Sequence, residues 1–265
     1  MLQLDGWLTI YLTVLAGVLG TVFGSFFNCM AWRLAHRESV LSGRSHCTAC
    51  GHVLGALDLV PVFSWIFLRG RCRYCGEKLS PRYLCTELLL GTAFVCLLYR
   101  YDISWELLRA LLFVSALFVL SLVDLEIFEI PDRFHVFMIA VWILFLPFSK
   151  NLSHQVISGL LGAFLISGSM LLLSIVYDRL KGMETFGGGD VKLLFCTGLY
   201  LGLAGNFLNL ILSCLIGILF AAVTTGKRKE RENPAVIPFG PSIAMGSFVC
   251  LMAGEPMIRW YLGLF

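Results

Sequence analysis

Two aspartates stand at the ends of long apolar runs, where ionisable side chains are costly and therefore point to function. Asp124 closes the apolar run 113–123, and Asp190 precedes the run that begins at 193. Two carboxylates brought together by helix packing do not both ionise, so one keeps its proton while the other acts as a base. An aspartic protease dyad has this requirement: the base takes a proton from water, and the protonated partner polarises the scissile carbonyl.

Three glycines, Gly187, Gly188 and Gly189, come directly before Asp190. Without side chains, their backbone can approach an extended peptide closely and offer it N–H and C=O groups. A phosphate-binding loop is a competing interpretation. It is disfavoured because no glycine occupies position 192 and no strand pattern precedes the run. The glycines are therefore predicted to bind substrate backbone.

The residues alone leave alternatives open for the two carboxylates. Asp190 could instead cap the helix that follows it, since aspartate is a favoured N-cap residue. Glu126 and Glu129 lie near the same helix end as Asp124, so spacing does not exclude either as the partner. Asp132 follows a proline and opens the next apolar run, which suits a cap. Lys192 could pair with either carboxylate of the dyad or face the headgroups.

Four of the ten cysteines form two C-x-x-C pairs separated by 21 residues: Cys47, Cys50, Cys72 and Cys75. Paired thiolates at this spacing are typical of tetrahedral Zn²⁺. Four protein thiolates leave no open coordination position, so the predicted role is structural. The pairs lie in a loop expected to be cytoplasmic and reducing, which disfavours disulfides. The other six cysteines lie in or beside apolar runs and are interpreted as small buried hydrophobes.

The composition is that of a membrane protein. Of 265 residues, 58% are hydrophobic and 14% are charged, against about 25% charged in soluble domains. The net charge of +3 is too near balance for a nucleic-acid binder, for which a clustered basic excess is expected. The lipid bilayer is therefore the expected partner, and binding to nucleic acid is not expected.

About eight transmembrane helices are expected, because a helix needs about 20 residues to cross the hydrocarbon. Threading them alternately, with the N-terminus outside, leaves 16 of the 20 Lys and Arg residues in inner loops, as the positive-inside rule requires. A seven-span alternative would place the basic loop after residue 226 outside. The apolar runs lie at about 6–32, 84–99, 105–123, 134–148, 156–177, two within 193–226 and 238–254. The two helices within 193–226 are expected to be divided by a turn at 202–206, where Gly202, Gly205 and Asn206 lie.

The expected fold is an all-α polytopic membrane protein with a small cytoplasmic zinc-knuckle loop domain. Three parts are predicted: residues 1–35 as the first transmembrane helix, 36–82 as the four-cysteine loop, and 83–265 as the transmembrane core. Within the loop, the apolar segment 58–68 is too short to span. It is expected to lie on the membrane surface or to dip into it.

Six blocks in this order resemble the type IV prepilin peptidase family, which are membrane aspartic proteases of the GxGD class. Together they run over most of the chain. They are GSFFN with WRL (24–34), PVFSW (61–65), RY to ELL (82–89), DLEIFEIPD (124–132), FGGGDVKL (186–193) and IPFGP (237–241).

The resemblance implies that Asp124 and Asp190 are the catalytic pair, and it decides against Glu126, Glu129 and Asp132. It further implies that the enzyme removes the short basic leader of prepilins or pseudopilins, after a glycine, at the cytoplasmic face of the bacterial inner membrane. The sequence does not say which pilin or pseudopilin system is served, nor the oligomeric state.

Family members with the cysteine loop commonly also methylate the new N-terminal amine, usually of phenylalanine, with S-adenosylmethionine as donor. All four cysteines are present here, so the resemblance predicts a bifunctional enzyme; the alternative is a monofunctional peptidase. Glu87 is the residue that we assign to methyl transfer, against the alternative of a buried or capping glutamate. Two other classes are alternatives: a transporter that uses the inner carboxylates, and a scaffold that docks through the zinc knuckle.

Overall fold

The computed structural model describes residues 6–40, 43–149, 151–182, 187–225 and 238–263. These residues form helices joined by turns, and the described part holds two isolated β-bridges but no strand. The expected all-α class is therefore confirmed. The principal helices are α1 (Gly6–Ala35), α2 (Phe63–Phe67), α3 (Arg82–Tyr101), α4 (Trp105–Ile127), α5 (Asp132–Phe145), α6 (Leu152–Lys181), α7 (Gly188–Thr225) and α8 (Gly240–Leu262), with short 3-10 turns η1 (Ala56–Leu59) and η2 (Leu146–Phe148).

Six of the described helices are long and apolar enough to cross a membrane: α1, α3, α4, α6, α7 and α8. The helix α5 has 14 residues and is shorter than these. The backbone of α7 breaks at Gly202, where φ is 71° and ψ is −176°, at the first residue of the turn expected to divide this region. With α5 and the two halves of α7 counted separately, the described residues contain the eight apolar helical segments that the sequence predicts. The basic loop after residue 226 lies outside the described residues.

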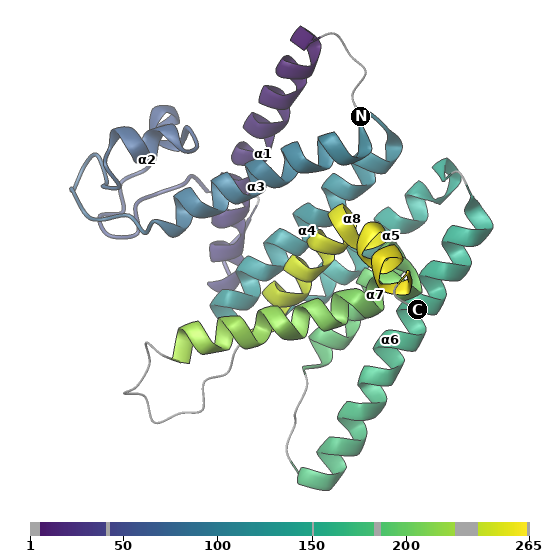
Figure 1. Ribbon diagram of the computed structural model, residues 1–265. Coiled ribbons are helices and arrows are strands. Elements are labelled where there is room, and N and C mark those ends of the chain that lie inside the picture. The colour runs from purple at the N-terminus through teal and green to yellow at the C-terminus, as the bar shows by residue number, and fades with distance from the viewer. Residues whose placement is uncertain (1–5, 41–42, 150, 183–186, 226–237, 264–265) are drawn as a thin grey trace. The chain divides into compact units, whose positions relative to one another are not determined.

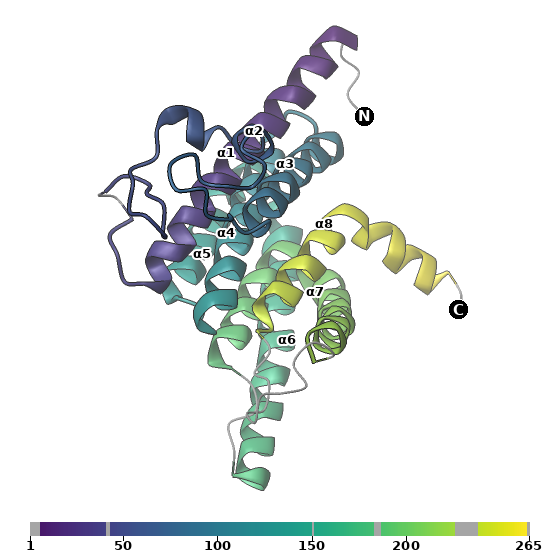
Figure 2. The same cartoon turned by 90° about the vertical axis from the view of Figure 1, so that its left-hand side faces the viewer.

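The chain divides into two compact units, Met1–Leu107 and Leu108–Phe265. This division follows packing, whereas the three-part division expected from the sequence follows motifs and remains a prediction. In the first unit α1 packs against α3 (Figures 1 and 2). A Cβ on Gly20 would lie 2.7 Å from the Cα of Gly91, so glycine allows the two backbones to touch, as is common between membrane helices.

In the second unit α7 packs against both α6 and α8 (Figure 1). Buried polar side chains satisfy backbone groups near the break at Gly202. The amide of Asn206, which is fully buried, donates to the carbonyls of Gly162 at 3.0 Å and Leu194 at 2.9 Å. Thr197 donates to the Asn206 oxygen at 2.8 Å. Because the bilayer core offers no water, such internal partners are what allow a helix to break within it.

The contact between α6 and α7 predicts a large difference between two glycine substitutions. A Cβ on Gly198 would lie 2.5 Å from the backbone of Gly162 and Ala163, so Gly198→Ala must push the helices apart. We expect a loss of about 2 kcal/mol or more in the free energy of unfolding. The matched control is Gly168→Ala on α6, where a Cβ meets nothing within 4 Å; it should be neutral or stabilising. Denaturation in detergent micelles measures both, and equal stability of the two variants would contradict the close packing.

Candidate active site and metal centre

Asp124 lies in the last turns of α4 and is buried, with 5% of its surface exposed. Its Oδ2 accepts a hydrogen bond from the backbone N–H of Gly240 at 3.0 Å. Gly240 is the first residue of α8, so this N–H is one of those that a helix leaves without an internal partner. A carboxylate is a fitting acceptor there, because the helix N-terminus carries partial positive charge. The start of α8 thus fixes the Asp124 side chain.

Asp190 is half-buried in the first turn of α7. It lies near the segment that carries Asp124, the other predicted catalytic residue. Ile130, just before α5, lies between the segments that carry them: its side chain would be 3.2 Å from a Cβ on Gly189 and 3.3 Å from a Cβ on Gly240. The end of α4 and the beginnings of α5, α7 and α8 therefore meet around the two aspartates.

The capping interpretation of Asp190 does not match this geometry. The helix α7 begins at Gly188, so Asp190 is already inside the first turn, and its own N–H donates to the carbonyl of Gly187 at 3.0 Å. Gly187 and Gly188 are exposed, and no atom of the described residues would lie within 4 Å of a Cβ on Gly188. The backbone beside Asp190 is thus open to a ligand, as peptide binding requires.

Lys192 pairs with neither aspartate of the predicted dyad. Its Nζ lies 2.7 Å from Oδ1 of Asp132, the first residue of α5. The ring of His135, one turn further along α5, has its Nδ1 3.7 Å from the same oxygen. The sequence offered Lys192 as a partner for either catalytic carboxylate; the structure places its charge on Asp132 instead, because α5 begins beside the first turn of α7.

The four predicted metal ligands form one cluster. The sulfur atoms of Cys47, Cys50, Cys72 and Cys75 all lie within 4.8 Å of one another. Tetrahedral Zn²⁺ with Zn–S bonds of about 2.3 Å needs sulfur atoms about 3.8 Å apart. The Cys47 and Cys75 sulfur atoms are 3.9 Å apart, so the cluster has the size that zinc requires.

The two cysteine pairs are held by matching turns, in segments 45–54 and 70–79. Both have the pattern C-x-x-C-G-x-x-L, and in both the glycine adopts a positive φ, which removes the cost of the tight turn. Three hydrogen bonds recur in the two segments: Cys47 N to His52 O and Cys72 N to Glu77 O, Gly51 N to Cys47 O and Gly76 N to Cys72 O, Leu54 N to Ser45 O and Leu79 N to Gly70 O. The turns are thus two copies of one knuckle.

The electrostatics of the cluster favour a bound cation. Backbone N–H groups of Cys50 and Ala49 lower the pKa of the Cys47 thiol to about 7. The backbone N–H of Glu77 favours a thiolate at Cys75, yet loss of water and the neighbouring thiols raise its pKa to about 12. Four thiols this close cannot all ionise unless a cation neutralises them, which is the chemistry that zinc supplies when bound.

Glu87 is buried on α3, with 6% of its surface exposed. Its Oε2 accepts a hydrogen bond of 2.7 Å from the backbone N–H of Val62. Val62 precedes α2 and has a φ of 64°, which is unusual for a β-branched residue. The Glu87 carboxylate therefore ties the four-cysteine loop to α3 at a point where α1 also packs closely, since a Cβ on Gly24 would lie 3.0 Å from the Glu87 Cα.

Two family models match the chain: the Bacterial Peptidase A24 N-terminal domain over residues 18–101 and the Type IV leader peptidase family over residues 111–222. A prepilin leader peptidase/N-methyltransferase of Bacillus subtilis is 32% identical over 92% of this chain and 96% of its own. The chain belongs to the type IV leader peptidase family. It is thus a membrane peptidase, and the family resemblance of its six sequence blocks is confirmed.

Other relatives of the peptidase carry the same name. The protein of Aeromonas salmonicida is 33% identical over 85% of this chain and 77% of its own. That of Neisseria gonorrhoeae is 28% identical over 94% of each chain. No solved structure matches the chain significantly.

The sequence did not predict a role for Gly240 or Ile130. Both lie in family blocks, IPFGP and DLEIFEIPD, but neither carries a group that does acid–base chemistry, so residue type gave no signal. Their contribution comes from position: one donates a backbone N–H to Asp124, and the other fills the space between Gly189 and Gly240.

Gly240→Ala is expected to reduce peptidase activity about 10²-fold, because a small displacement of a catalytic group costs this much. The added Cβ would lie 2.6 Å from Asp124 Oδ2, so the carboxylate must move. Gly254→Ala is the matched control on the same helix, since its Cβ would make an ordinary 3.5 Å contact with Cys250. Initial rates at saturating substrate measure the effect. Full activity of Gly240→Ala would show that the contact to Asp124 does not matter for cleavage.

Proposed function

We propose that this peptidase removes the leader of a prepilin or pseudopilin with Asp124 and Asp190 as its catalytic pair. The single observation that best supports this is the convergence of the segments that carry them: Ile130 lies against both Gly189, next to Asp190, and Gly240, whose N–H binds Asp124. Family membership and the names of the relatives supply the substrate class.

In this mechanism one aspartate is ionised and the other protonated, because two close carboxylates share a proton. The ionised member takes a proton from water as the water oxygen bonds to the scissile carbonyl carbon. The protonated member donates a hydrogen bond to the carbonyl oxygen. The amide nitrogen then accepts a proton, the C–N bond breaks and the mature N-terminal amine leaves. Gly187, Gly188 and Gly189 would hold the extended peptide by backbone hydrogen bonds.

We further propose that the enzyme methylates the new N-terminal amine, as the names of the relatives suggest. S-adenosylmethionine would supply the methyl group that this amine takes up. Residues 36–82 would form the associated domain, with Zn²⁺ on the four cysteines as a structural ion. Glu87 would contribute by holding the loop at Val62.

The proposed orientation places the N-terminus outside and the active site at the cytoplasmic face of the bacterial inner membrane. It rests on the distribution of Lys and Arg, of which 16 of 20 fall in inner loops. The end of α4 and the start of α7, which carry the two aspartates, then face the compartment where a basic leader is made.

The deciding experiment is an assay of the purified protein in detergent with a prepilin substrate, followed by the intact mass of the product. Leader loss together with a gain of one methyl group that depends on S-adenosylmethionine would establish both activities. Leader loss alone would leave a monofunctional peptidase. Absence of both, with folded protein and with Asp190→Asn behaving like the parent, would favour the scaffold or transporter readings.

A further inference from the structure

The helix α2 turns its apolar face outward. Phe63, Ile66 and Phe67, at spacing i, i+3 and i+4, have 60%, 54% and 80% of their surfaces exposed. On the inner side Trp65 is half-buried and covers Gly70, where a Cβ would lie 2.8 Å from the indole. In a water-soluble domain the face with Phe63, Ile66 and Phe67 would be buried. Here that face is exposed instead.

The exposed apolar surface continues into η1 and the turn after it. Leu57 is 73% exposed, Leu59 42% and Val60 40%. We call the combined surface the apolar ridge; it consists of Leu57, Leu59, Val60, Phe63, Ile66 and Phe67. A contiguous apolar surface of this kind marks an interaction site.

The ridge is held in place from within the loop. Asp58 accepts hydrogen bonds from the Gly55 N–H at 3.1 Å and the Tyr74 hydroxyl at 3.2 Å, and it pairs with Arg73 at 2.7 Å. Although burial opposes ionisation, these partners hold the pKa of Asp58 below its ordinary value. The two knuckles flank the ridge in sequence, so the cluster of four cysteines joins the two ends of the segment that carries it. The exposure of the apolar ridge is therefore fixed by contacts within the loop.

The depth of the ridge follows from a contact with α3 made by Val62, which lies between Val60 and Phe63 of the ridge. The Val62 N–H bonds to Glu87 at 2.7 Å, and Glu87 is five residues into a helix that begins at Arg82. At 1.5 Å per residue this is about 7.5 Å along the helix axis. Leu88 and Leu89 of the same membrane-length helix are 47% and 61% exposed. The ridge thus lies beside a part of α3 that carries exposed apolar side chains.

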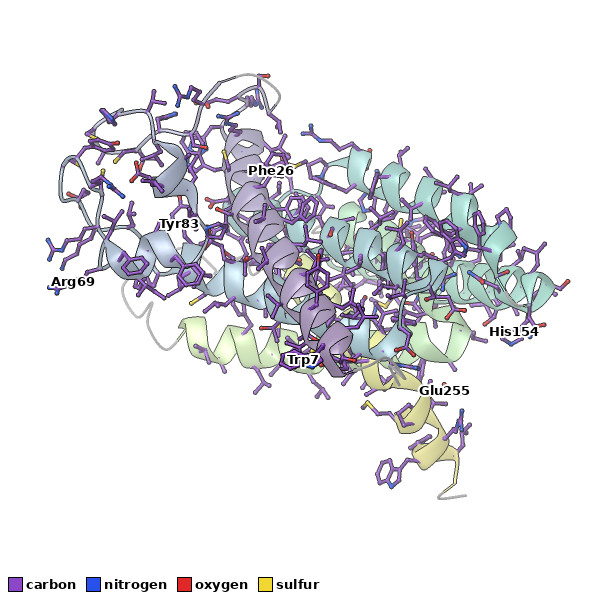
Figure 3. The ribbon with its side chains drawn as sticks, turned by 90° about the horizontal axis from the view of Figure 1, so that it is seen from above. Trp7, Phe26, Arg69, Tyr83, His154 and Glu255 are labelled. Carbon is purple, nitrogen blue, oxygen red and sulfur yellow. The ribbon has the colours of Figure 1, made fainter. Side chains whose placement is uncertain are left out.

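Basic residues accompany the ridge. Arg69 and Arg71 follow α2 directly and are exposed, and Figure 3 shows Arg69 pointing outward from the edge of the loop. Arginines at the margin of an apolar surface are attracted to anionic headgroups. The charge and the apolar face together match a lipid surface better than a second apolar protein surface.

We propose that the apolar ridge is inserted into the bilayer at the boundary between headgroups and acyl chains, on the side where α1 ends and α3 begins. Both flanking helices enter the same membrane, so the ridge continues their lipid-facing surface. The four-cysteine loop then lies on the membrane instead of extending into water. Anionic lipids bind it through Arg69 and Arg71.

The test uses the full chain in vesicles of phosphatidylglycerol and phosphatidylethanolamine, with the photoreactive p-benzoylphenylalanine in place of Phe67. After irradiation, intact mass reports lipid adducts. Leu89 on α3 is the positive control, and Thr48, exposed in the first knuckle, is the negative control. We expect labelling at Phe67 to approach that at Leu89 and to exceed that at Thr48 at least about 10-fold, as for a side chain within the interface. Phe63 provides a second position should the Phe67 variant fold poorly.

Labelling of Phe67 and Phe63 at the level of Thr48 would overturn the proposal. So would adducts to residues 108–265 of the chain or to a second polypeptide in place of lipid, since the ridge would then be a protein interface. In the double variant Arg69→Glu with Arg71→Glu, lipid labelling at Phe67 should fall several-fold in anionic vesicles and remain unchanged in zwitterionic phosphatidylcholine. Equal labelling of this variant and its parent in anionic vesicles would overturn the role assigned to the two arginines.

Discussion

Asp190→Asn and Asp124→Asn should each lower the rate of prepilin cleavage by at least about 10³-fold, within the range for removal of a general acid or base. Asparagine has nearly the shape of aspartate, but it can neither take a proton from water nor hold one for the carbonyl. The fold should survive. In Asp124→Asn the amide oxygen can still accept the Gly240 N–H that Asp124 accepts now. Single-turnover cleavage of a prepilin by each purified variant is the measurement.

The controls for this prediction come from the neighbouring acids. Glu126→Gln and Glu129→Gln leave the two aspartates untouched and should cleave at rates near the parent's. The double variant of Asp124 and Asp190 should be hardly slower than either single one, because groups that act as a unit lose activity together. Persistent cleavage in one aspartate variant would remove that residue from the pair, and a defect in Glu126→Gln or Glu129→Gln of equal size would reassign its partner.

Cys72→Ser is expected to abolish zinc binding and to unfold the four-cysteine loop. Structural zinc in small domains contributes about 10–16 kcal/mol of binding energy, which is also folding energy. The cluster requires four sulfur atoms within 4.8 Å of one another, and a serine hydroxyl is a poor replacement for a thiolate. Metal analysis of the purified protein and limited proteolysis of residues 36–81 report the loss. Methylation should disappear, whereas cleavage should persist because both aspartates belong to the other compact unit.

A cysteine outside the cluster provides the comparison. Cys214 is exposed on α7, and Cys214→Ser should retain zinc, protease resistance of the loop and both activities. If Cys72→Ser kept its full zinc content and a resistant loop, the metal assignment would be wrong. If it lost zinc and retained methylation, the loop would have no part in methyl transfer.

The amino-acid sequence by itself determined the features that depend on neighbours along the chain. Apolar runs of membrane length predicted the helices, and the glycine at position 202 marked the break in α7, because hydrophobicity and backbone freedom are local properties. The C-x-x-C pairs likewise predicted one metal centre, since each knuckle folds within ten residues. Residue type alone identified Asp124 and Asp190 as costly at a membrane edge, but only the family resemblance chose them over Glu126 and Glu129.

The tertiary structure decided which distant residues meet. Nothing along the chain indicated that the first N–H of α8 would bind Asp124 across 116 positions, or that Lys192 would pair with Asp132 instead of a catalytic carboxylate. The apolar face of α2 points outward because Trp65 packs against Gly70 and the Val62 N–H binds Glu87. These contacts form where helices and loops from different parts of the chain meet. Their strength depends on the distances between those segments, which the order of residues along one segment does not determine.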